Sequence, residues 1–202
     1  MSRDDNPTFK NDLIAFYDRG SSSSNVLKCM ILDLFFEKKK VIGGHIWKSC
    51  TSGVGLNNFG LIQADIHKPR NGLLLYFSIE RAFDVKEICF IYNPLNQQLN
   101  LRVLKPDLRE QFVLDLPDRQ QSNIDLKFKD IEYRPLQFSP PNSPFKRLLS
   151  WHAKCSTKFA LEIGWINQAE ADEFLPYFNL SDGATHPVEL GEPNYASTTS
   201  SE

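Results

Sequence analysis

The sequence predicts an α+β fold in which short strands alternate with helices. Two apolar runs, 41–46 and 73–77, are too short for helices and are typical of buried strands. Two longer stretches, 7–20 and 145–163, repeat apolar residues every three or four positions, which is the period of an amphipathic helix. A further pair of apolar runs within 88–104 flanks a polar turn and predicts a β-hairpin.

The length and composition indicate one domain. The chain has 202 residues, 41% of them hydrophobic, which suffices for one substantial core. We divide it into an N-terminal helix and loop (1–25), a strand-rich core (26–105), a connector with C-terminal helices packed on the core (106–180), and an acidic tail (181–202) whose composition predicts disorder.

The sequence also limits where the protein is expected to act. It has no run of eighteen apolar residues, so we expect no membrane span, and its first residues lack the apolar stretch of a secretory signal. We therefore expect a soluble intracellular protein, nuclear or cytoplasmic. The four cysteines are widely scattered and form no Cys-x-x-Cys pair, which predicts buried thiols instead of a zinc knuckle or a disulfide framework.

The charge is unevenly distributed along the chain. Residues 159–202 contain eight acidic side chains and no Lys or Arg. Residues 1–158 hold 23 basic and 17 acidic side chains, a net charge of +6, although the whole chain carries −2. A basic body of this kind can attract a polyanion, but the same excess is also compatible with an ordinary solvated surface.

The elements before residue 90 follow from local signals. Asn6-Pro7 is typical of a helix start, and residues 26–32 are compatible with a buried strand or a second helix. Residues 51–70 are rich in Gly, Asn and Ser and predict a long loop with about one turn of helix. The strand 73–77 then runs into Ser78, a good N-cap for a helix that places Ile79, Ala82 and Phe83 on one face.

The elements after residue 105 are predicted in the same way. A polar stretch is followed by prolines at 135, 140, 141 and 144, which indicate an extended connector. The helix 145–163 carries an apolar stripe of Phe145, Leu148, His152, Cys155 and Phe159, so we expect His152 to be a core histidine. Asn167 and Glu170 have the spacing of a capping box for a last helix that reaches Phe178.

Three short motifs occur in a recognisable order. Gly44-His45-Ile46 ends the first predicted strand, Asn71-Gly72-Leu73-Leu74-Leu75 opens the second, and Ile79-Glu80-Arg81-Ala82-Phe83-Asp84 forms the helix after it. This arrangement resembles the HNH nucleases, whose ββα-metal core has the same order of elements. The likeness is closest to the branch with "AHI", "NGLLL" and "FD" motifs and spans roughly residues 26–105.

The resemblance implies an α+β fold with an HNH-like ββα-metal core, extended by the hairpin and flanked by N- and C-terminal helices. It implies His45 as the general base that accepts a proton from water, and Asn71 as the residue that orients it. Glu80 stands at the position of a metal ligand. Lys48, Arg70 and Arg81 lie near the motifs and are expected to contact DNA phosphates.

The chain departs from the family pattern at two positions. Glu80 replaces the usual His or Asn, which favours Mg²⁺ or Mn²⁺ over a softer metal such as zinc. Gly44 stands where many relatives have an acidic residue or a second His, so it supplies no side-chain ligand. Asp84, one helical turn after Glu80, then serves either as a second metal ligand or as a group that fixes the helix end.

The sequence thus predicts a metal-dependent endonuclease that hydrolyses DNA phosphodiester bonds. The alternative is a catalytically degenerate HNH domain that acts as a nucleic-acid or protein binding module, which the Gly44 and Glu80 departures favour. A third interpretation assigns the function to the helical C-terminal third and makes the core a scaffold. Trp47, beside the first motif, is expected to cover the core.

Overall fold

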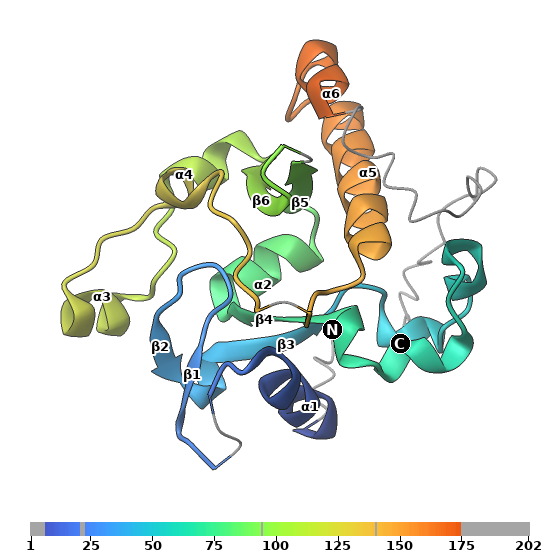
Figure 1. Ribbon diagram of the computed structural model, residues 1–202. Helices are drawn as coiled ribbons and strands as arrows, with labels where there is room; N and C mark the ends of the chain where they lie inside the picture. The colour runs from blue at the N-terminus through green and yellow to red at the C-terminus, as the bar shows by residue number, and fades with distance from the viewer. Residues whose placement is uncertain (1–6, 21–22, 94, 140, 175–202) are drawn as a thin grey trace, which may run out of the picture.

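A computed structural model describes residues 7–20, 23–93, 95–139 and 141–174. Within these residues it contains six α-helices and three antiparallel sheets of two strands each, which confirms the α+β class (Figure 1). The helices are α1 (Pro7–Tyr17), α2 (Phe77–Asp84), α3 (Leu116–Ser122), α4 (Phe128–Ile131), α5 (Lys146–Glu162) and α6 (Gln168–Phe174). The strands are β1 (Val26–Lys28), β2 (Phe35–Glu37), β3 (Val41–His45), β4 (Gly72–Tyr76), β5 (Ile88–Asn93) and β6 (Gln98–Val103).

The centre of the fold is the pair of strands β3 and β4. They run antiparallel with His45 opposite Gly72 and Val41 opposite Tyr76. Helix α1 covers one face of this pair and α2 the other (Figure 1). All five residues of β4 are buried, as expected for a strand that is covered on both faces and therefore lacks polar alternation.

Helix α2 follows β4 without a loop. The predicted N-cap at Ser78 is wrong, because the helix begins at Phe77 and the Ser78 hydroxyl donates to the carbonyl of Val113 at 2.5 Å. The predicted apolar face is confirmed, since Ile79, Ala82 and Phe83 are all buried. This face holds α2 against the sheet and the hairpin that follows.

The remaining strands form two hairpins. The predicted hairpin is confirmed as β5 and β6, with Ile88 opposite Val103. The ambiguous segment 26–32 begins with a strand, β1, which pairs with β2. Cys29 and Cys89 are buried as predicted, whereas Cys50 is exposed.

Helix α5 packs on β5, and the predicted stripe is confirmed in part: Phe145 and Leu148 are buried, whereas Cys155 and Phe159 are only partly buried. Ala153, Ser156 and Ala160 are fully buried, because small side chains let the helix approach the strand closely. The capping box before α6 is confirmed: the Asn167 side chain accepts from the Glu170 amide, and the Glu170 carboxylate accepts from the Asn167 amide, both at 2.9 Å. The predicted continuation to Phe178 and the acidic tail lie outside the described residues.

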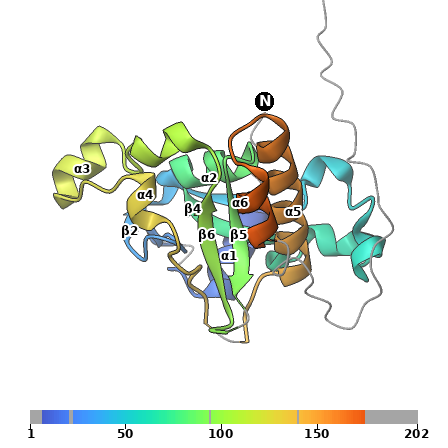
Figure 2. The ribbon, with the colours of Figure 1, turned by 90° about the horizontal axis from the view of Figure 1, so that it is seen from above.

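Two segments that were predicted as loops contain short helices. Residues 49–71 form four 3₁₀ turns, at Ser49–Thr51, Leu56–Phe59, Gln63–His67 and Pro69–Asn71. The polar stretch after β6 holds α3 and α4. Seen from above, α3 and the segment 49–71 lie toward opposite ends of the molecule (Figure 2). No helix among the described residues is both long and apolar enough to cross a bilayer.

Candidate functional site

Asn71 joins the end of β3 to the start of β4. Its side chain is fully buried. The side-chain oxygen accepts from the Trp47 amide at 2.8 Å, and the side-chain nitrogen donates to the carbonyls of Trp47 and Ile66, each at 3.0 Å. The Asn71 carbonyl also accepts from the Ile46 amide at 2.8 Å. The bridging geometry expected of Asn71 is therefore present, and it fixes the two residues that follow His45.

His45 is the last residue of β3, and its ring lies on the side of the sheet that α1 covers. The ring stacks on Phe9 with centroids 3.8 Å apart and planes 6° from parallel. Gly72, opposite His45, leaves room for this contact, because a Cβ at Gly72 would lie 2.6 Å from Phe9 Cζ. The residue as a whole is half-buried, but Nε2 of its ring is shielded from solvent, and α1 holds the ring at the end of the strand.

Glu80 lies on the opposite face of the same strand. A Cβ on Gly44 would meet Glu80 Cγ at 3.2 Å and Glu80 Oε1 at 3.4 Å, so the carboxylate of Glu80 lies over Gly44. Adjacent residues of a strand project to opposite faces. Gly43, one position earlier, accordingly faces Leu13 of α1. The glycine that supplies no ligand thus provides the space that the Glu80 side chain fills.

The side chain of Lys48 reaches the C-terminal end of α2. Its ammonium forms an ion pair with the Asp84 carboxylate, and Glu80 also attracts it electrostatically. Burial lowers the pKa of Lys48, and the negative charge of Glu80 opposes that shift. The structure therefore brings three of the predicted residues together, and Asp84, the candidate second ligand, is engaged with Lys48.

His152 lies beneath this group and is a core histidine, as predicted. Its Nε2 is 3.0 Å from the Phe83 carbonyl, which can only accept, so Nε2 carries the proton and donates. Nδ1 is 3.4 Å from the Ser156 hydroxyl, and the ring stacks on Phe83 at 3.8 Å. Burial lowers the pKa of His152 to about 3. His152 is therefore neutral and holds the C-terminal end of α2.

The two predicted arginine contacts are both at the surface of the protein. Arg70 is exposed, lies over the Phe145 ring at 4.6 Å and donates to the Ser143 carbonyl. Arg81 is exposed on α2. Neither arginine forms an ion pair with another described residue, which leaves both guanidinium groups accessible to an anion.

The carboxylates of Glu80 and Asp84 are the candidate metal ligands on α2. Mg²⁺ is commonly held by one or two carboxylates together with substrate phosphates and water. Glu80 and Asp84 are two carboxylates of this kind, one helical turn apart, and the Asp84 carboxylate is paired with Lys48. Over the described ranges no three or more His, Cys, Asp or Glu side chains are grouped to hold an ion, and a structural zinc centre would need four ligands.

A buried polar network that the sequence analysis did not predict lies at the other end of the β3–β4 pair from His45. Lys40 forms ion pairs with Asp118 at 2.7 Å and Asp115 at 3.1 Å. The Tyr76 hydroxyl donates to Asp118 at 2.6 Å and accepts from the Asp115 amide. The available signal was Asp115 followed by Leu116-Pro117, a typical helix start, and Asp115 is indeed the N-cap of α3. Lys40 therefore ties the start of β3 to α3, and Tyr76 ties the end of β4 to the same helix.

Trp47 packs edge-on against Phe59, and its indole nitrogen donates to the Val54 carbonyl, so its expected core-covering role is confirmed.

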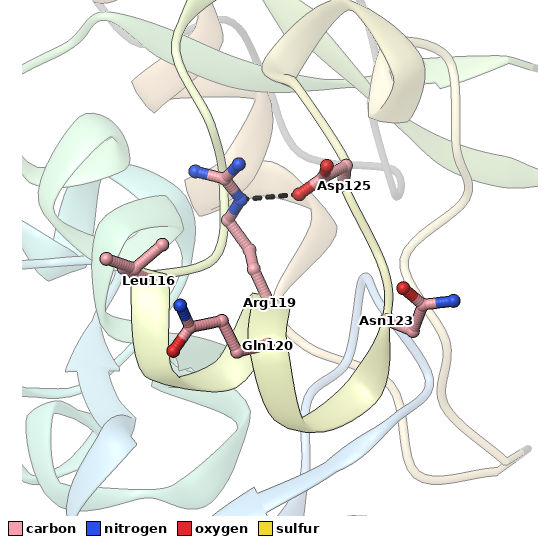
Figure 3. Close-up of a pocket in the computed structure, with 5 residues that line it drawn as sticks. All are labelled: Leu116, Arg119, Gln120, Asn123 and Asp125. Atoms are coloured by element: carbon pink, nitrogen blue, oxygen red, sulfur yellow. Dashed lines mark hydrogen bonds and ion pairs between the residues drawn. The ribbon is translucent and has the colours of Figure 1, made fainter.

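A shallow hollow lies elsewhere, on α3, and the Arg119–Asp125 ion pair runs across it (Figure 3). Its lining is Leu116, Arg119, Gln120, Asn123 and Asp125. None of the predicted site residues belongs to it.

No protein-family model matches the chain, and none of the curated proteins matches it significantly. The fold and the site themselves define the class: an α+β protein with a strand–strand–helix unit, β3–β4–α2, in which Asn71 joins the strands. His45 and Glu80 flank the end of the first strand in this unit.

Proposed function

We propose that β3, β4 and α2 form an HNH-like ββα-metal core and that the protein is a metal-dependent endonuclease that hydrolyses DNA phosphodiester bonds. The observation that carries the proposal is the Asn71 bridge. It is made by the residue that the resemblance assigns to this role, and it holds the chain directly after His45. A buried asparagine with all three bonds satisfied fixes backbone geometry strongly.

The proposed mechanism uses the two faces of β3. In an in-line displacement at phosphorus, the attacking water and the leaving oxygen lie on opposite sides of the phosphate. His45 is the general base on the α1 side, because a neutral imidazole accepts a proton at physiological pH. Phe9 orients the ring by stacking. His45 and the Glu80–Asp84 pair lie on opposite faces of β3, so the proposal requires a phosphate that contacts both groups past the end of this strand.

On the other side, Glu80 and Asp84 would hold Mg²⁺ or Mn²⁺, which supplies charge neutralisation for the phosphate and the departing oxygen. Gly44 positions Glu80 by leaving the space above the strand open. Arg70 and Arg81 are proposed to contact neighbouring phosphates of the DNA backbone, which would orient the substrate without reading its sequence.

A second candidate is a catalytically degenerate HNH domain that binds nucleic acid without cleaving it. The ion pair between Lys48 and Asp84 favours it, because it occupies the carboxylate of one of the two proposed metal ligands. In this case the basic residues near the motifs bind the phosphate backbone, and His45 and Glu80 are structural.

Plasmid nicking separates the two candidates. Supercoiled plasmid is incubated with the protein and Mg²⁺ or Mn²⁺, beside His45→Ala and Glu80→Ala, with the exposed α6 variant Glu173→Ala as control. Loss of the base or of the metal ligand is expected to lower the rate by about 100-fold or more. Each variant is first checked for folding by thermal unfolding.

Equal nicking by wild type, His45→Ala and Glu80→Ala would contradict the nuclease proposal. So would absence of nicking by wild type with either metal. If wild type retards DNA in a gel without nicking it, the second candidate is supported instead. Retardation should then weaken in Arg70→Ala and Arg81→Ala, and it should fall with increasing salt, since phosphate contacts release counterions.

A further inference from the structure

We propose that the ammonium group of Lys48 is the resident cation of the acidic site on α2, and that a divalent metal binds there only by displacing it. This inference rests on the proposed function, because it concerns the metal that the nuclease would use. It deepens that proposal by assigning a role to a residue that the sequence predicted as a phosphate contact.

The position of Lys48 is fixed by its backbone on both sides. The residue before it, Trp47, is held by two hydrogen bonds with the Asn71 side chain, one donated by the Trp47 amide and one accepted by the Trp47 carbonyl. The carbonyl of Lys48 accepts from the Thr51 hydroxyl at 2.8 Å and from the Thr51 amide at 3.1 Å. The side chain therefore starts from a rigid point three residues after His45. It is about two-thirds buried, with 32% of its area exposed, and extends to the C-terminal end of α2.

The acids on α2 give a physical reason for a cation at this place. Glu80 and Asp84 are four residues apart on one helix, and like charges at that spacing repel. Asp84 also lies at the helix C-terminus, where a negative charge is disfavoured by the helix dipole. Lys48 relieves both effects, since it pairs with Asp84 and attracts Glu80.

Besides the two carboxylates, the Cys50 side chain also favours the charged form of the Lys48 ammonium. His152, below it, is neutral and donates to the Phe83 carbonyl. Lys86, just beyond the helix end, adds a second positive charge that acts on Lys48. Glu80 and Asp84 are therefore the carboxylates that both Lys48 and a divalent metal would use, and one cation competes with the other.

Metal binding by variants of Lys48 tests the inference. Mn²⁺ is titrated calorimetrically into wild type, Lys48→Met and the control Lys154→Met, an exposed lysine on α5. Thermal unfolding is measured with and without Mn²⁺. We expect Lys48→Met to bind Mn²⁺ about tenfold more tightly or better, equivalent to about 1.4 kcal/mol, and to gain more thermal stability from it than wild type does. Lys154→Met should behave like wild type.

A second variant keeps the test valid if Lys48→Met does not fold. Lys48→Gln retains a donor for Asp84 but no charge, so it should show the same gain in Mn²⁺ affinity. Equal affinity in wild type and the neutral variants would overturn the inference and leave the nuclease proposal standing. Absence of Mn²⁺ binding in all of them, together with absence of nicking, would overturn both.

Discussion

Replacing Asn71 by alanine is the most direct probe of the site. The change removes one acceptor and two donors from a fully buried position and leaves three backbone groups without their partner: the amide and carbonyl of Trp47 and the carbonyl of Ile66. A buried polar group that loses its hydrogen bond costs about 1–3 kcal/mol. Because Trp47 is only partly buried, water recovers some of this cost, and we expect a loss of about 3 kcal/mol in the free energy of unfolding.

The loss is measured by urea unfolding, with the midpoint and slope followed by tryptophan fluorescence. For a chain of this size it corresponds to a decrease in Tm of roughly 6–12 °C. Asn71→Asp keeps the shape of the side chain and the hydrogen bond from the Trp47 amide. It replaces the donating nitrogen by an oxygen, which cannot donate to the two carbonyls, so the free energy of unfolding should fall by about 2 kcal/mol or more. Asn57→Ala, on an exposed side chain of the same segment, is the control and should change stability by less than about 0.5 kcal/mol.

The reasoning is refuted if Asn71→Asp unfolds at the same urea concentration as wild type. In that case the two hydrogen bonds that the Asn71 side chain donates would contribute nothing to the free energy of unfolding. A loss in Asn57→Ala as large as that in Asn71→Ala would point to a general sensitivity of the segment instead of the bridge.

Three further predictions concern the surroundings of the site. Gly44→Ala should push Glu80 aside by a few tenths of an ångström and lower plasmid nicking by about tenfold, with a stability loss near 1 kcal/mol. His152 is neutral when folded, because its folded-state pKa of about 3 lies below its unfolded value. Its contribution to stability is therefore complete above about pH 6.5 and falls by up to about 1.4 kcal/mol per unit as the pH drops toward 3, a slope that His152→Gln should reduce. Tyr76→Phe removes the hydroxyl that binds Asp118 and should cost about 1–3 kcal/mol in urea unfolding.

Each of these predictions has a contrary outcome. Unchanged nicking in Gly44→Ala would show that the position of Glu80 does not matter for cleavage. An acid unfolding profile that is identical in wild type and His152→Gln would place the titrating group elsewhere. Tyr133→Phe, on an exposed ring, is the control for Tyr76→Phe, and an equal effect of the two would exclude the buried network as the cause.

Elements with strong local patterns were predictable from the sequence. The strands β3 and β4, the apolar face of α2 and the hairpin of β5 and β6 follow from apolar periodicity. The capping box at Asn167 and Glu170 is a contact between near neighbours and formed as predicted. Local signals failed where a distant partner competed for the same side chain. Ser78 looked like an N-cap, but its hydroxyl donates to Val113.

The candidate site also has one part that the sequence predicts and one part that depends on the tertiary structure. The sequence by itself determined which residues stand at the strand ends and on α2, because their order and spacing are properties of the chain: His45, Asn71, Glu80 and Asp84. The tertiary structure alone decided that Lys48 pairs with Asp84 and that His45 stacks on Phe9. These partners are separated by 36 residues in each case, and such contacts depend on how α1 and α2 pack on the sheet, which no local pattern specifies.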